Sequence, residues 1–368
     1  MCRHNTGVAR GGASQAHPCR TKIIGALEKR HTCLEKPNTW SATHSRKSVT
    51  ASCLILAYLS SAVHFSGGLI DDPGKAAEAK AVDFLRREVP AWSRGNGCFS
   101  CHNNGDAARA LYTASQQGYR ISPDVLAETT AWLSEPRNWD KGKGDPGFND
   151  QRLANLQFAL ALLVAIETGH VADKKQLLVA AQRVASDQDS SGAWLIDAGA
   201  IVGSPATYGS TLGTALASRV IRAAGLDDPN KTLEKAEQWL RNARVNSVTV
   251  AAALLLTATD NPDGPVKIHR NECLTMIERA QTKDGGWGPY ADSPPEVFDT
   301  AVVLLSLAAV GKSESLTSHI RRGRDYLARQ QDLDGGWPAT TRPSGGQSYA
   351  QRLSTTGWAT LALLATSK

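Results

Sequence analysis

The chain has 368 residues, of which 41% are hydrophobic and 21% charged, so it is long enough to form one domain with a large core. Its formal net charge of +6 comes from residues 1–50, which hold nine Lys or Arg and two Asp or Glu. The rest of the chain holds 32 basic and 33 acidic residues. This balance excludes a strongly basic folded surface, and we expect no nucleic-acid-binding face.

Residues 1–50 show no hydrophobic periodicity, and we expect a basic, disordered extension or a stretch that is not normally translated. Arg46 and Lys47 then precede an apolar run over residues 53–65, with small residues near its end. This order is typical of a secretory signal, so we assign residues 51–66 as a signal segment and predict a periplasmic or otherwise exported protein. The run is short for a membrane span, and an ordinary buried helix behind a basic tail is the alternative.

Residues 75–368 have the pattern of a single all-α domain built from six repeated units. Each unit has a charged, amphipathic first helix, a loop, and a second helix that is apolar nearly all round. Helices that are apolar on every side are buried, so the second helices should form an inner ring and the first helices an outer ring. We therefore predict an α/α toroid of about six helix pairs. The second helices are expected at residues 101–115, 150–168, 207–224, 247–259, 296–310 and 354–366.

The sharpest local signal lies where the first inner helix should begin, in Cys98-Phe-Ser-Cys101-His102. Two thiols three positions apart can bond both vinyl groups of haem, and the adjacent histidine can then ligate the iron. Gly97 and Gly105 allow a flat ligand to approach the backbone closely. The motif predicts covalent haem c on Cys98 and Cys101 with His102 as the iron ligand, and it agrees with export, because bacterial c-type haem is attached outside the cytoplasm.

Two other chemistries fit the same residues. Zinc would need a fourth ligand beyond Cys98, Cys101 and His102, and no second cysteine pair stands at zinc-finger spacing. A redox disulfide between the two cysteines is the other alternative, although the surrounding pattern is not that of thioredoxin. Without residues 1–66 the only further cysteine is Cys273, so no disulfide framework follows. We assign no sixth iron ligand, the candidates being His170, His269, His319 and Met276, with a five-coordinate or water-ligated iron as the alternative.

Three copies of one loop motif organise the second half of the chain, at residues 188–194, 281–287 and 331–337. Two copies read Gln-x-x-Asp-Gly-Gly-Trp and the first reads Gln-x-x-x-Gly-x-Trp. The glycines permit a sharp turn after an outer helix, the tryptophan can cover a helix end, and the glutamine can bond exposed backbone groups. We expect a structural role for these loops. The fourth unit, near Trp239, lacks the motif, and we predict that it has the shortest connection.

These repeats resemble the QW repeats of the terpenoid-cyclase and protein-prenyltransferase toroid superfamily, those of squalene–hopene cyclases in particular. The resemblance covers about residues 75–366 and is strongest from residue 270 onward. It implies the toroid fold, whereas the reaction has to be argued from the site.

The resemblance implies a catalytic Asp-x-Asp-Asp-Thr-Ala motif, and the matching stretch here is Glu296-Val-Phe298-Asp299-Thr-Ala. Phe298 stands where the family's proton donor should be, and phenylalanine has no proton to give. We predict that the chain does not cyclise squalene. Glu296 and Asp299 are expected to interact with the backbone at an inner-helix N-terminus, and they remain weak candidates for catalysis. A prenyltransferase-type zinc site is not expected either, because Cys273 falls in an outer helix without a suitable histidine.

The sequence therefore predicts an exported, haem-bearing toroid protein that transfers electrons or binds a small apolar ligand in its central cavity. The alternatives are an enzyme acting on an isoprenoid or a polysaccharide, and a non-catalytic scaffold of helical repeats. Whether the chain is an enzyme is left open at this point.

Overall fold

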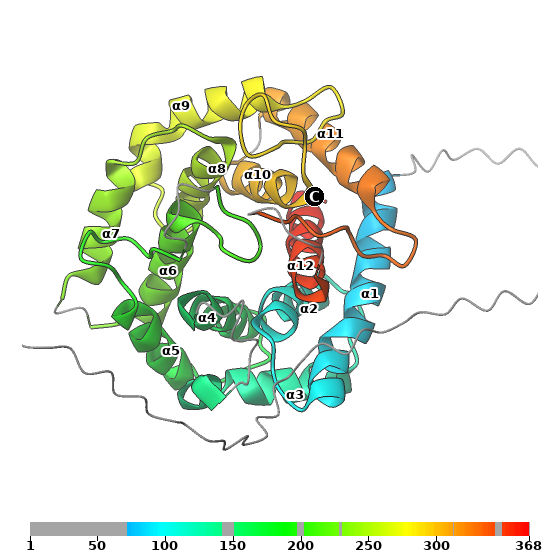
Figure 1. The fold of residues 1–368 in the computed structure, drawn as a ribbon, viewed down its shortest axis with the longest axis vertical. Helices are drawn as coiled ribbons and strands as arrows, with labels where there is room; N and C mark the ends of the chain where they lie inside the picture. The colour runs from blue at the N-terminus through cyan, green and yellow to red at the C-terminus, as the bar shows by residue number, and fades with distance from the viewer. Residues whose placement is uncertain are drawn as a thin grey trace, which may run out of the picture. The chain divides into compact units, whose positions relative to one another are not determined.

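In the computed structural model, six pairs of α-helices form two concentric rings (Figure 1). The structure describes residues 72–141, 151–196, 202–227, 230–311, 313–342 and 348–367, so residues 1–50 and the predicted signal segment 51–66 lie outside the described part. The outer helices are α1 (Pro73–Asn96), α3 (Pro123–Leu133), α5 (Lys175–Ser186), α7 (Thr232–Arg241), α9 (Pro265–Ala280) and α11 (Glu314–Gln330). The inner helices are α2 (Ala108–Gln116), α4 (Gln151–Glu167), α6 (Ser210–Ala224), α8 (Val248–Leu256), α10 (Val297–Ala309) and α12 (Tyr349–Thr366).

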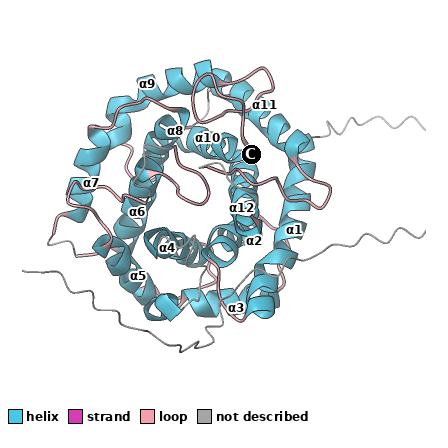
Figure 2. Ribbon diagram, in the orientation of Figure 1, coloured by secondary structure: helices cyan, strands magenta, loops and turns pink. Residues whose placement is uncertain are grey.

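Shorter helical segments complete the described chain: a π-helix, η1 (Cys101–Ala107), leads into α2, and η2 (Pro136–Lys141) and η3 (Thr257–Thr259) are 3-10 turns. Figure 2 shows helices and loops and no strand over the described residues. The predicted all-α toroid of six helix pairs is confirmed. Within the described part, none of the helices combines the length and the apolar character that a membrane span requires.

Burial follows the division that the sequence predicts. Inner helix α4 is buried at every position over residues 153–165, because neighbouring inner helices and outer helices pack on all its sides. Outer helix α11 buries only one stripe, and its other positions carry charged and polar side chains. Helices that are apolar all round are stable only when they are covered on all sides, so the double ring satisfies both patterns.

We call the three motif loops at residues 188–194, 281–287 and 331–337 the Gly-Trp loops. The tryptophan of each Gly-Trp loop joins the two helices of its unit. The indole nitrogens of Trp194, Trp287 and Trp337 donate to backbone carbonyls near the ends of α5, α9 and α11, at 2.6, 2.8 and 2.8 Å. The backbone nitrogens of the same residues donate to Thr214, Thr300 and Thr356 of the following inner helices at 3.0, 2.9 and 3.1 Å. All three indoles are fully buried. The tryptophans therefore have the structural role predicted for them.

The glutamine and the glycine of each loop join one unit to the next. The side-chain amides of Gln188, Gln281 and Gln331 donate to carbonyls of α7, α11 and α1 at 2.9, 2.9 and 2.8 Å. Gly335 has a φ of +99°, and a β-carbon there would lie 2.4 Å from the Lys80 carbonyl of α1. Because Gln331 and Gly335 contact the first helix of the domain, the last loop closes the ring.

The connections between outer and inner helices differ strongly in length. The fourth unit crosses over in residues 242–247, but the first unit crosses over in residues 97–100. The prediction that the fourth connection is the shortest was therefore wrong. The first connection is shorter because α1 ends at a left-handed glycine, Gly97 (φ +63°), and η1 begins at Cys101.

Candidate functional site

The Cys98–His102 segment lies in the short first connection and the start of η1. The Gly97 nitrogen donates to the Ser93 carbonyl at 2.9 Å and ends α1, which leaves Cys98 in the turn. The Ser100 hydroxyl then accepts from the His102 nitrogen at 3.2 Å and caps η1. The motif begins the first inner helix as predicted, but its first turn is a π-helix. Single π-helical turns are rare and are frequent at functional sites.

His102 has a defined tautomer in this arrangement. Its Nδ1 lies 2.7 Å from the Ser354 hydroxyl of α12, and that hydroxyl donates to Asp106 Oδ2 at 2.8 Å. Since the Ser354 proton is directed at the carboxylate, its oxygen accepts a proton from Nδ1. The Nε2 atom then carries the lone pair, and it forms no hydrogen bond to any residue in the described part of the chain. Burial lowers the pKa of His102, against the opposing charge of Asp106, which favours the neutral imidazole.

Asp106 is the centre of a buried polar cluster at the middle of the inner ring. Its Oδ2 accepts from Gln157 Nε2 at 2.7 Å, in addition to Ser354. The hydroxyl of Tyr208, which lies just before α6, donates to Oδ1. The Arg109 Nη2 atom lies 3.5 Å from the same oxygen. The carboxylate thereby joins three inner helices and the loop before a fourth. Sequence reasoning missed this cluster, whose only local signal was an aspartate four positions after the motif histidine.

Aromatic rings surround the same segment. Trp92 of α1 stacks on Tyr349 of α12 with centroids 5.7 Å apart, and Phe99 stacks on Trp132 of α3 at 4.5 Å. The indole nitrogens of Trp92 and Trp132 are buried and have no hydrogen-bond acceptor among the described residues. Buried indole N–H groups normally find a partner, so these two donors are available to an acceptor other than the described residues, such as water or a ligand.

The thiols are less suited to the alternative chemistries. Burial raises the pKa of Cys101 to about 12, and the negative charge of Asp106 acts in the same direction. A protonated thiol is a poor nucleophile, so this pKa disfavours disulfide exchange at Cys101. Across the described ranges, no group of three His, Cys, Asp or Glu side chains is arranged to hold a metal ion. A zinc site at Cys98, Cys101 and His102 therefore lacks a donor set in this part of the chain.

Glu296 and Asp299 lie at the start of α10, as predicted, but their main partner is a side chain. Arg342 donates to Glu296 at 2.6 Å and to both oxygens of Asp299 at 2.9 Å. Glu296 occupies the N-cap position and forms no side-chain cap hydrogen bond, so the expected bonding to the helix backbone is not found there. Burial raises the pKa of Asp299 to about 7, although Arg342 opposes the shift. Phe298 is fully buried and packs edge-on against Trp358 at 5.4 Å.

The candidate sixth iron ligands all have local roles. His170 contacts the hydroxyls of Ser115 and Thr168 at 3.2 and 3.0 Å. His269 contacts the Arg241 carbonyl at 3.0 Å, and His319 contacts Gln281 of a Gly-Trp loop. Met276 packs against the hydrophobic core from α9. The contacts of these four residues therefore support none of them as an iron ligand.

Residues 250–368 match the family profile of the squalene-hopene cyclase C-terminal domain. Lanosterol synthase erg7A of Aspergillus fumigatus is 29% identical over 123 residues, which are 32% of this chain and 16% of the synthase. The squalene–hopene cyclase of Zymomonas mobilis is 28% identical over 136 residues, 33% of this chain and 20% of the cyclase. That of Bradyrhizobium diazoefficiens is 32% identical over 68 residues, 17% of this chain and 10% of the cyclase. The chain thus matches a fifth or less of each curated relative.

Solved structures extend the fold similarity to most of the chain. Two variants of the type II terpene cyclase MstE from Scytonema, both in complex with geranylgeranyl dihydroxybenzoate, superpose with TM-scores of 0.52 and 0.51. Each alignment covers 80% of this chain and 97% of the cyclase at 10% sequence identity. At this identity the likeness concerns the fold alone. The toroid is thus shared with terpene cyclases, and the family profile matches its last third.

Proposed function

We propose that this chain is an exported c-type haem protein built on a terpene-cyclase-like toroid. Cys98 and Cys101 would hold the haem through thioether bonds, and His102 would ligate its iron. The observation that carries this proposal is the pair of hydrogen bonds that links Asp106 through Ser354 to His102. These bonds fix the proton on Nδ1 and leave the Nε2 lone pair available.

Metal-binding histidines almost always donate their second N–H to a carboxylate, a carbonyl or water, which orients the ring and raises its basicity. Here Ser354 stands between the imidazole and Asp106, and each hydrogen bond in the chain is 2.7 or 2.8 Å long. Asp106 is only 1% exposed and is held by further donors, so the ring orientation is fixed from the core of the toroid.

Two features of the surrounding side chains support the proposal. The indole N–H groups of Trp92 and Trp132 find no acceptor among the described residues. The carboxylate groups of haem, its propionates, could accept hydrogen bonds from them. The stacked pairs beside the motif, with Phe99 and Tyr349, would limit access of water. Bound haem would supply a one-electron iron couple, or an iron site beside which a small apolar ligand could bind.

An isoprenoid-active enzyme is the second candidate, supported by the similarity of residues 250–368 to the squalene-hopene cyclase C-terminal domain. Protonation of an alkene needs a carboxylic acid that is free to give up its proton. Phe298 stands at the position where the family has that acid, and both neighbouring carboxylates, Glu296 and Asp299, are held by Arg342. The contacts of Glu296 and Asp299 with Arg342 therefore argue against alkene protonation by either carboxylate.

The test is expression in a bacterial periplasm together with a c-type cytochrome maturation system. The wild-type protein should show a Soret band that survives denaturation and haem that resists acid–acetone extraction. Cys98→Ala or Cys101→Ala should shift the pyridine haemochrome spectrum, because one vinyl group stays free, and the double variant should release its haem. His102→Ala should change the iron spin state or block maturation. Wild-type protein without Soret absorbance but with stoichiometric zinc, or with a Cys98–Cys101 disulfide, would refute the proposal.

The positioning role of Ser354 has a test of its own. Ser354→Ala removes the acceptor of the Nδ1 proton and should lower the basicity of His102, which shifts the reduction potential of the haem to a higher value. Ser306→Ala is a matched control, because it removes a buried hydroxyl that donates to the Val303 carbonyl of α10. Equal reduction potentials in the wild type and Ser354→Ala, with folded protein in both cases, would show that the hydrogen bonds from His102 to Asp106 do not affect the reduction potential of the haem.

A further inference from the structure

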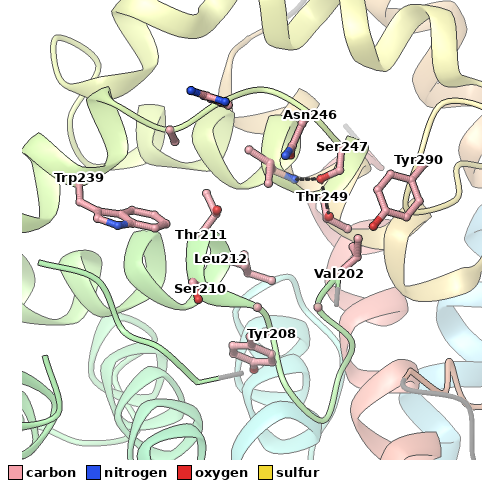
Figure 3. A pocket seen from close by; sticks show the side chains of 15 residues that line it. Val202, Tyr208, Ser210, Thr211, Leu212, Trp239, Asn246, Ser247, Thr249 and Tyr290 are labelled. Carbon is pink, nitrogen blue, oxygen red and sulfur yellow. Dashed lines mark hydrogen bonds between the residues drawn. The ribbon is translucent and has the colours of Figure 1, made fainter. Parts of the chain in front are cut away.

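A cavity of about 320 Å³ lies at the ends of α6, α7 and α8, and none of the residues 98–102 belongs to its lining (Figure 3). It occurs beside the connection 242–247, which has no Gly-Trp loop. The neighbouring units have the long connections 187–209 and 281–296, which contribute the opposite walls through Tyr208 and Tyr290. The cavity is thus bordered by one short connection and by the longer connections of the two neighbouring units.

The wall formed by residues 202–209 is held rigidly. Tyr208 has a φ of +56°, a left-handed conformation that is uncommon for a residue with a side chain. A β-carbon on Gly203 would lie 1.9 Å from the Tyr208 carbonyl, so the loop folds tightly on itself. The Tyr208 hydroxyl is bound to Asp106, and Arg342 donates to the Gly203 carbonyl at 2.6 Å. Residues held in sparsely populated conformations cluster at functional sites, where the strain keeps a binding surface in place.

The walls combine aromatic rings with unused polar groups. Trp239 and Tyr290 face the cavity from opposite sides in Figure 3. Between them lie the side chains of Ser210, Thr211 and Asn246, for which no hydrogen bond to another described residue occurs. Hydroxyl and amide groups both donate and accept, so an apolar isoprenoid would leave them unsatisfied, whereas a hydroxylated ligand would satisfy them.

One charge stands in the lining, that of Arg244. Its guanidinium forms no ion pair with a described carboxylate, and none of the described residues that line the cavity is acidic. A guanidinium is a planar, permanently charged fork that matches carboxylate and phosphate groups. The lining therefore favours a ligand with one negative charge.

We infer that this pocket binds a monosaccharide-sized hydroxylated ring that carries one anionic group. The cavity volume is at the lower end of the range of about 300–1,000 Å³ typical of ligand pockets, which fits a single ring. Trp239 and Tyr290 would pack on the C–H faces of the ring, Ser210, Thr211 and Asn246 would bond its hydroxyls, and Arg244 would pair with the anion. The inference does not depend on haem at Cys98 and Cys101.

The test is calorimetric titration of the full-length protein with glucuronate, glucose 6-phosphate and glucose. We expect at least one of the anionic sugars to bind tenfold or more tightly than glucose, and the better of the two identifies carboxylate or phosphate as the preferred anion. Raising the salt concentration should weaken that binding, because Arg244 is exposed. Equal binding of all three sugars, or no binding of any at millimolar concentration, would overturn the inference.

Variants locate the binding. Arg244→Gln should bring the affinity for the anionic sugar down to that for glucose, while Arg279→Gln, which removes an exposed charge at the end of α9, should change neither. Trp239→Ala should lower the affinity for all three sugars at least tenfold. If Trp239→Ala does not fold, Thr211→Val, which changes the side chain with little change in shape, provides the second test. Unchanged affinities in folded Arg244→Gln and Thr211→Val would place the sugar elsewhere and refute the assignment.

Discussion

Units with and without a Gly-Trp loop are built differently at the same end of the ring. In the units that have the loop, a buried tryptophan such as Trp287 joins the outer helix to the inner one, and a glutamine joins the next unit. In the first unit the connection 97–100 carries Cys98, with Cys101 next to it at the start of η1, and in the fourth the connection 242–247 borders a polar cavity. The loops fix the geometry of the repeat, and both the Cys98–His102 segment and the polar cavity occur at connections that lack a loop of this kind.

The largest expected effect is on the loops themselves. Trp287→Ala should lower the free energy of unfolding by about 3–5 kcal/mol, because it leaves a large cavity and removes the hydrogen bond to the Ile277 carbonyl. Trp239→Ala in the unit without the loop should cost about 1 kcal/mol or less, because its ring is only half-buried. Urea denaturation followed by circular dichroism measures both. Equal losses would contradict the division between loop and pocket tryptophans.

A second contrast concerns charge at the inner-helix N-termini. Asp106 of the first unit is held mainly by neutral donors, whereas Asp299 of the fifth is held by Arg342. The pKa of Asp299 is raised to about 7 in the folded protein, above the value of an unfolded aspartate. Its stabilising contribution is therefore complete below about pH 4 and is lost as the pH rises through 7.

Asp299→Asn removes this titration. The stability of the wild type relative to Asp299→Asn should fall between pH 4 and 7, by up to about 4 kcal/mol at roughly 1.4 kcal/mol per pKa unit, and stay constant above that range. Thermal or urea unfolding of both proteins across this pH range measures the difference. A difference that grows with rising pH would mean that Arg342 outweighs burial and lowers the pKa instead.

The fold was predictable because its signals are local and repeated. Apolar stretches such as residues 153–165 and the three Gly-Trp loops each indicate their own environment, and six such units leave little choice but a double ring. The length of the first connection was not predictable, because it depends on where α1 ends and on the π-helical start at Cys101.

The site was predictable only where its residues are neighbours in sequence. Cys98, Cys101 and His102 form a motif that can be read directly, and whether they hold haem stays a prediction. Asp106 and Ser354 meet across 248 positions of sequence, and nothing near either residue in the sequence indicates the other. The predicted helix-terminal carboxylates Glu296 and Asp299 were located correctly, but their partner Arg342 comes from the following Gly-Trp connection, which local patterns do not reveal.

The smallest effect tests why the loops need glycine where they meet the next unit. Gly335 and Gly169 both have left-handed backbones, with φ of +99° and +79°, so an alanine at either position is strained. Only at Gly335 would the new β-carbon meet another helix, at 2.4 Å from the Lys80 carbonyl, whereas Gly169 has open space around it.

Gly335→Ala should therefore be less stable than Gly169→Ala by about 1–3 kcal/mol, since α1 must move away to admit the methyl group. The measurement is the difference between the urea unfolding free energies of the two variants, each referred to the wild type. Because the left-handed conformation is common to both sites, that difference isolates the close approach of two units. If the two variants lose the same stability, the loop and α1 are not in rigid contact, and the last Gly-Trp loop does not close the ring as tightly as its geometry indicates.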